Sequence, residues 1–131
     1  MTAMTAALLA LASEVEAGEG PDREMDARVW CALHDGLSVV TAWYGPAYVK
    51  GPDESTNVPE PVTGSVDAAL ALLASKLPGW CYDMDDLGAE PCVRLYGPGS
   101  GEGQSQCGKA WTLPRAIVAA TLRAVAGRAE G

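Results

Sequence analysis

The stretch from Pro61 to Leu87 passes from a helical to a strand-like pattern of apolar residues, and the rest of the chain is organised around it. After Ser65, a good N-cap, four apolar residues recur at helical spacing: Val66, Leu70, Leu73 and Leu77. The Pro78-Gly79 pair ends this helix because proline cannot continue the helical hydrogen bonds. Apolar and polar residues then alternate over Trp80–Asp85, with the two-residue period of a half-covered strand. The pattern predicts a helix packed across an antiparallel sheet.

Two helices and a strand are expected before this unit. Thr5 can cap a first helix of about 12 residues, and Pro21 suits the first position of a second helix that runs to about His34. A β-branched and aromatic run, Leu37–Tyr44, predicts a strand. The proline-rich segment Tyr44–Thr63 has little aliphatic bulk and predicts an irregular surface loop.

Two strands and a helix are expected after the stretch from Pro61 to Leu87. Cys92–Tyr96 and Gln104–Trp111 have strand character and flank the glycine-rich segment 97–103. A last helix starts at Thr112, with Pro114 in its first turn. The predicted order is ααβαβββα, an α+β fold in which helices sandwich an antiparallel sheet. With 131 residues, the chain 1–131 is expected to form a single domain with one core.

The charge and the apolar runs of the sequence indicate which partners and which cellular location to expect. The formal net charge of −8 argues against DNA or RNA as a partner, since a phosphate backbone is bound mainly through Lys and Arg. The chain has no apolar run of the roughly 20 residues that a transmembrane helix needs. The apolar start, 1–12, lacks the basic region of a signal peptide. We expect a cytoplasmic protein.

Two metal sites can be imagined, and neither is favoured. Cys31 and His34 form a C-x₂-H pair that could hold zinc with two of the remaining cysteines, Cys81, Cys92 and Cys107. Without a CxxC pair, four free and mostly buried thiols are the better interpretation. The carboxylates of residues 83, 85, 86 and 90 could bind a hard cation, but they lack the spacing of a calcium loop and are explained by a solvated strand face.

Catalytic motifs are equally weak, so we expect no enzyme and no cofactor. Segment 103–110, GQSQCGKA, has the spacing of a phosphate-binding loop but carries Ala110 where Ser or Thr should hold Mg²⁺. His34, the single histidine, lies near a helix end, where hydrogen bonding to the last carbonyls explains it. An enzyme that uses carboxylates alone is the remaining catalytic alternative.

Three segments carry a family resemblance: GPDREMDARVW at 20–30, PVTGSVDAALALLASKLPGW at 61–80 and TLPRAIVAATLRAVAG at 112–127. Together they resemble the small phage-encoded proteins of the phage ABA sandwich domain family. The resemblance implies an α/β/α-type sandwich and a phage or prophage gene expressed in the bacterial host cytoplasm. It implies no activity and no catalytic residues. The proline-rich insertion around 45–60 departs from the family pattern.

These features lead to two hypotheses on function, both for a non-enzymatic phage protein that antagonises host antiviral defence. In the first, the protein is a sponge that sequesters a nucleotide-derived immune signal, as a homo-oligomer with sites shared between subunits. Its aromatic residues would stack on the base and its cations would bind phosphate: Trp43, Tyr48 and Tyr96, with Arg94, Lys109 and Arg115. In the second hypothesis, this acidic protein captures a host protein by covering a basic surface on that host protein. Core packing with a solvated sheet edge is the ordinary explanation of the same six residues.

Overall fold

The computed structural model describes residues 2–34, 37–40, 47–53, 56–85, 90–97 and 106–130. Four helices lie in this part of the chain: α1 (Ala3–Ala17), α2 (Arg23–Leu33), α3 (Val66–Lys76) and α4 (Leu113–Glu130). Sheet A contains β1 (Ser38–Val40), β2 (Tyr48–Lys50) and β3 (Thr56–Asn57). Sheet B contains β4 (Cys81–Asp85), β5 (Cys92–Tyr96) and β6 (Gln106–Lys109). The α+β class and the antiparallel pairing are confirmed, and the order gains two strands to become ααβββαβββα.

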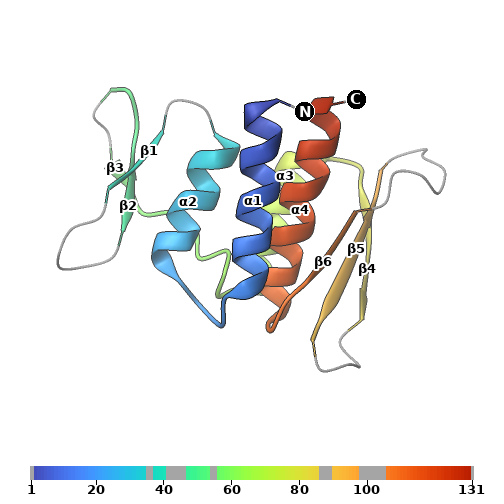
Figure 1. The fold of residues 1–131 in the computed structure, drawn as a ribbon. Helices are drawn as coiled ribbons and strands as arrows, with labels where there is room; N and C mark the ends of the chain where they lie inside the picture. The colour runs from blue at the N-terminus through green and yellow to red at the C-terminus, as the bar shows by residue number, and fades with distance from the viewer. Residues whose placement is uncertain are drawn as a thin grey trace.

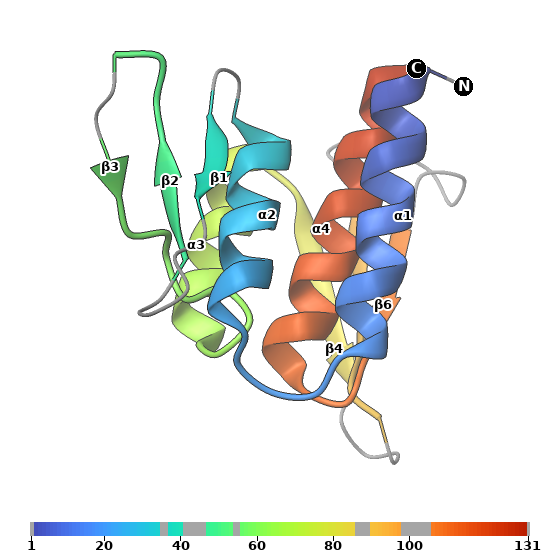
Figure 2. The same ribbon diagram turned by 60° about the vertical axis from the view of Figure 1, so that its left-hand side comes forward.

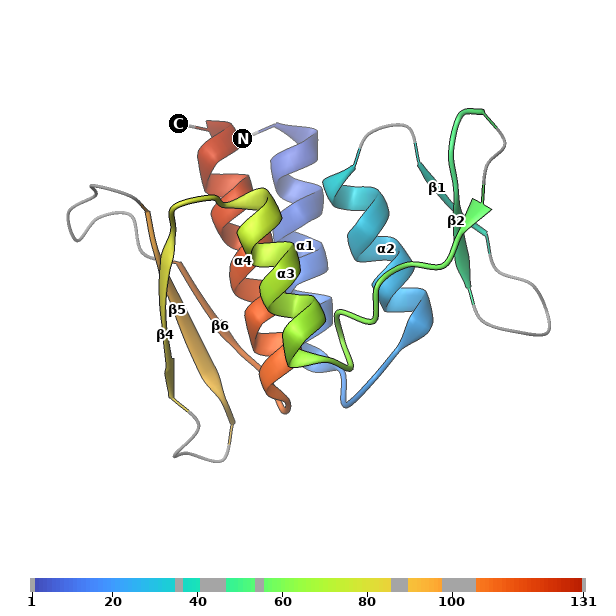
Figure 3. The same ribbon diagram turned by 180° about the vertical axis from the view of Figure 1, so that it is seen from behind.

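The helices lie between the two sheets, with α4 at the centre (Figure 1). Helix α1 runs antiparallel to α4 on one side, α3 packs on the other, and β5 and β6 cross its third side (Figures 1 and 3). Residues 116–122 of α4 are all fully buried, which explains why this helix is rich in Ala. Small side chains let α1, α3 and sheet B all approach the same helix closely.

One face of sheet B is inside the protein and the other is open to solvent. Val93 and Leu95 are completely buried against the helices, while their neighbours in β5 point outward. Pairing of Asp83 with Arg94, and of Arg94 with Cys107, fixes the register of the three strands. The inner face predicted for β4 is only partly covered, since Tyr82 keeps 47% of its surface exposed.

Sheet A attaches to the rest of the protein through α2 (Figure 2). Ala27, Ala47 and Val49 form a small separate core there. The prediction of an irregular loop over 44–63 is wrong in its middle, where β2 and β3 pair antiparallel. One buried valine is enough to hold so short a strand, and the prolines lie outside it.

A buried polar cluster fastens the segment that follows sheet A back onto α2. The Asp26 carboxylate, 1% exposed, accepts hydrogen bonds from the backbone N–H and the hydroxyl of Thr63 at 2.8 and 2.7 Å. Arg23 donates to the same carboxylate at 2.9 Å and to the Pro59 carbonyl at 2.6 Å. These bonds satisfy a carboxylate that burial alone would destabilise. Segment 59–63 is therefore fixed beside the start of α2.

The helix starts follow the cap chemistry, with two shifts from the sequence prediction. Ser65 caps α3 as predicted, accepting from the Ala68 N–H at 3.1 Å. Thr2 rather than Thr5 caps α1, and the N-cap of α2 is Asp22, so Pro21 precedes the helix instead of taking its first position. The Asp22 carboxylate accepts a hydrogen bond from the Met25 N–H, and a proline side chain has no acceptor that could do this. Among the described helices, none has the length and apolar character of a membrane span.

Candidate functional site

The outer face of sheet B brings together three of the six predicted ligand-binding residues. Arg94 and Tyr96 alternate on β5, and Lys109 on β6 pairs with Cys92. A hydrogen bond with the Tyr96 side chain raises the pKa of Arg94. The adjoining hollow, of about 170 Å³, is lined by Asp83, Met84, Asp85, Cys92 and Arg94. It is smaller than the roughly 300–1,000 Å³ of typical small-molecule pockets.

The other predicted residues lie elsewhere. Tyr48 is on β2, at the opposite end of the molecule from sheet B (Figure 1). Arg115 is 2% exposed, and its guanidinium donates to the carbonyls of Val15 at 2.9 Å and Gly20 at 2.8 Å. Its N–H groups thus fix the end of α1, away from the outer face of sheet B. Trp43 lies outside the described residues.

The cysteines differ from the prediction of mostly buried thiols. All four are free, but Cys81 and Cys107 are exposed and Cys31 and Cys92 are half-buried. Alternation on β4, β5 and β6 puts three of them on the solvent side of sheet B. A thiol is small enough to stand on a wet face without a large cost, and the buried positions of these strands are taken by larger or closer-packing residues.

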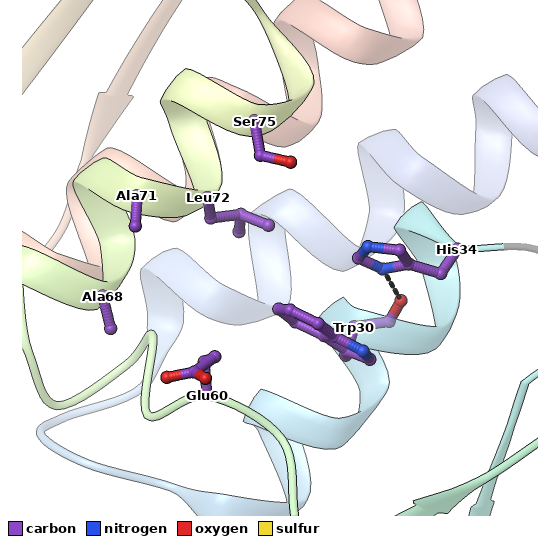
Figure 4. A pocket seen from close by; sticks show the side chains of 7 residues that line it. All are labelled: Trp30, His34, Glu60, Ala68, Ala71, Leu72 and Ser75. Atoms are coloured by element: carbon purple, nitrogen blue, oxygen red, sulfur yellow. Dashed lines mark hydrogen bonds between the residues drawn. The ribbon is translucent and has the colours of Figure 1, made fainter. Parts of the chain in front are cut away.

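A groove between α2 and α3 is a second candidate, which the sequence analysis missed (Figure 4). It measures about 270 Å³ and is lined by Trp30, His34, Glu60, Ala68, Ala71, Leu72 and Ser75. The indole of Trp30 stacks on the His34 imidazole, with ring centroids 4.4 Å apart and planes at 25°. The four-residue spacing of Trp30 on α2 and His34 at its C-cap places the two rings on one side of the helix, and this spacing was the sequence signal that could have indicated the pair.

The polar groups of the groove are few. His34 Nδ1 lies 2.9 Å from the Trp30 carbonyl oxygen. A carbonyl only accepts, so Nδ1 donates this hydrogen bond. This contact confirms the predicted role of His34 at its helix end. With the Glu60 carboxylate and the Ser75 hydroxyl at its margins, the groove can hold an apolar or aromatic group and a hydrogen-bond donor.

Nothing in the described ranges assembles a metal centre of three or more His, Cys, Asp or Glu side chains. Asp83 and Asp85 lie along a solvent-exposed strand, as expected for a wet face. No family model, curated protein or solved structure matches the chain.

Proposed function

We propose that the protein is a non-enzymatic binding protein that captures a partner protein, anchored in the groove between α2 and α3. The observation that carries this proposal is the stacked Trp30–His34 pair, which forms one wall of a mainly apolar groove. Tryptophan in a pocket that excludes water is typical of the residues that dominate protein–protein affinity. A side chain from the partner would fill the groove and pack against Leu72.

Charge supports a basic partner. The chain carries a net charge of −8, and Glu60 adds a carboxylate at the groove itself. Complementary charge speeds association and makes it sensitive to salt. The resemblance to phage proteins motivates the further proposal that the partner is a host defence protein in the bacterial cytoplasm.

The test is capture of partners from a bacterial host lysate by the wild-type protein and by Ser75→Arg, which puts a long cation into the groove. Ser13→Arg, on an exposed part of α1, adds the same charge away from the groove and serves as the control. We expect a partner that binds the wild type and the control, is lost with Ser75→Arg, and weakens as salt rises. Equal capture by all three proteins would rule out the groove as the anchor.

Sequestration of a nucleotide-derived signal is a second candidate, supported by the common position of Arg94, Tyr96 and Lys109 on sheet B. Their cations can bind phosphate and Tyr96 can stack on a base. Because this face is open, a bound nucleotide would keep much of its surface in water. We therefore propose that a second copy of the chain covers it, in a homo-oligomer.

This candidate is tested by thermal shift with cyclic dinucleotides, cyclic trinucleotides and ADP-ribose derivatives. A ligand at 100 times its Kd adds about 2.7 kcal/mol to the free energy of unfolding. The shift should vanish in Arg94→Ala and Lys109→Ala and persist in Lys50→Ala, which removes a cation from sheet A. Light scattering should show the ligand-bound oligomer. If no ligand raises the melting temperature while a partner protein still binds at the groove, the sponge proposal is rejected and protein capture remains as the proposed function.

A further inference from the structure

Two thiols lie next to each other on the outer face of sheet B. Cys92 pairs with Lys109, and Cys107 pairs with Arg94, so the two cysteines are diagonal neighbours on adjacent strands. Both point outward, because the intervening Val93 is completely buried on the inner face. Burial and the nearby Cys107 side chain raise the pKa of Cys92. The two thiols form a dithiol at the edge of the 170 Å³ hollow, whose lining includes Cys92.

Strand geometry favours a bridging ion over a disulfide. Diagonal residues of an antiparallel pair are about 7–8 Å apart between Cα atoms, whereas disulfides usually need about 4.4–6.8 Å. An ion bound at about 2.3 Å from each sulfur, as for zinc thiolates, spans about 4.5 Å between the sulfurs. Two cysteine side chains at diagonal positions on the same face of adjacent strands can turn toward one another to meet that span without a change of strand register.

The number of ligands selects the metal. No cluster of three or more metal-binding side chains exists among the residues that the structure describes, so a four-coordinate ion such as Zn²⁺ lacks ligands there. Two thiolates are the soft ligands that select copper(I). With one monovalent ion they form a complex with one net negative charge.

Two cations and two carboxylates surround the cysteines on the outer face of sheet B. Arg94 on β5 and Lys109 on β6 flank the two cysteines. Asp83 and Asp85 face the same side from β4, and Glu16 of α1 is neutralised at the far edge by its ion pair with Arg123. Asp85 pairs directly with Cys92 and Asp83 pairs with Arg94, so the two cations offset the two carboxylates of β4 around the thiols.

We propose that Cys92 and Cys107 form a two-coordinate site for copper(I) on the outer face of sheet B. Binding forms two Cu–S bonds and releases two thiol protons to solvent, with no change of oxidation state. The site is independent of the groove between α2 and α3, so its failure would leave protein capture untouched.

The test is an anaerobic titration of the reduced protein with copper(I) against a chromophoric chelator. We expect one ion per chain in the wild type, and at least a 100-fold weaker affinity in both Cys92→Ser and Cys107→Ser. Cys31→Ser and Cys81→Ser are the matched controls and should bind like the wild type, since neither thiol belongs to the pair. Circular dichroism checks that each variant is folded.

The pH dependence gives a second readout. Burial and the neighbouring Cys107 raise the pKa of Cys92, against the opposing effect of Arg94 and Lys109. Because metal binding displaces thiol protons, the affinity for copper(I) should rise with pH. Binding that persists in the two serine variants would overturn the proposal. So would a Cys92–Cys107 disulfide, formed with peroxide as the oxidant and two waters as by-product, in a protein that binds no copper(I).

Discussion

Arg115 shows how one side chain can hold two distant parts of the chain together. Its guanidinium satisfies carbonyls at the end of α1 from a buried position in α4. We expect Arg115→Met to lower the free energy of unfolding by about 1–3 kcal/mol or more, since the buried Val15 carbonyl left unpaired costs about 1–3 kcal/mol and the half-buried Gly20 carbonyl adds a smaller cost. Urea denaturation measures the change. Arg128→Met, which removes an exposed donor to the Lys76 carbonyl from the same helix, should cost less than about 1 kcal/mol.

If the two arginine variants had equal free energies of unfolding, the hydrogen bonds of Arg115 would not contribute more to stability than the exposed bond of Arg128.

Glu16 ties α1 to α4 and β6 in a pH-dependent way. Burial raises its pKa, but hydrogen bonds from Arg123 and from the Lys109 N–H, together with the charge of Arg123, lower it below the ordinary 4.5. The folded-state pKa is therefore below the unfolded value. The stabilisation is complete above about pH 4.5 and is lost as the pH falls through the folded-state pKa.

We expect the wild type to lose more stability than Glu16→Gln when the pH is lowered from about 6 to about 3. Denaturation curves at a series of pH values would show this. Glu14→Gln is the control, because its ion pair with Arg28 is more exposed than that of Glu16 with Arg123. Parallel pH profiles for the wild type and Glu16→Gln would contradict the assignment.

Contacts between residues that are far apart in the sequence could not be predicted from local sequence patterns. The sequence places Arg115 in the first turn of a helix, where phosphate binding is a reasonable prediction. Its actual partners are 95 and 100 positions away along the chain. The groove was missed for a related reason: Trp30 and Leu72 come from helices that are adjacent only in the folded chain. Local patterns carry no information on which helices meet.

At the scale of elements, Gly108 lets β6 lie directly on α4. A Cβ there would be 2.2 Å from the Ala116 carbonyl oxygen and 2.7 Å from the Ala120 nitrogen. Both are backbone atoms of a packed helix, so the strand itself must move. Gly108→Ala should lower the free energy of unfolding by about 1–3 kcal/mol or more, as expected for overpacking.

Thermal denaturation checks this, with Gly127→Ala on α4 as the matched control. A Cβ at Gly127 meets its nearest atom at 3.6 Å, an ordinary contact, and alanine raises helix stability by about 0.5–1 kcal/mol. Opposite signs are therefore expected from the same substitution. A Gly108→Ala protein as stable as the wild type would mean that β6 does not pack so closely.

Elements were predictable in proportion to their length. The helices have several turns of periodic apolar residues, α1, α2 and α3 have side-chain N-caps, and all four helices were predicted. The strands β2 and β3 have 3 and 2 residues, too few for an alternating pattern to appear among prolines. Pairing with β1 and packing on α2, both non-local, decide that these residues form strands.

At the scale of the whole molecule the prediction of one core is wrong, because the described residues form two cores of unequal size. The main core gathers residues from all four helices and sheet B, whereas sheet A rests on Ala27, Ala47 and Val49. Val49→Ala should therefore release sheet A while the main core stays folded. Hydrogen exchange should quicken in β1, β2 and β3 alone. Val93→Ala, equally buried but in the main core, should speed exchange throughout the helices and sheet B.

A common response of all regions to both valine variants would show that the molecule opens as one unit.

The antiparallel packing of α1 on α4 brings the start of the first helix beside the end of the last (Figures 1 and 2). A short Gly-Ser linker could join Ala3 to Glu130, and new termini could be opened at the exposed turn between Pro52 and Asp53. The two central helices would then form a hairpin that is local in sequence. Such a circular permutant should keep the fold, and it should refold faster than the natural order because the contacts of α1 with α4 would no longer close a loop of nearly the whole chain.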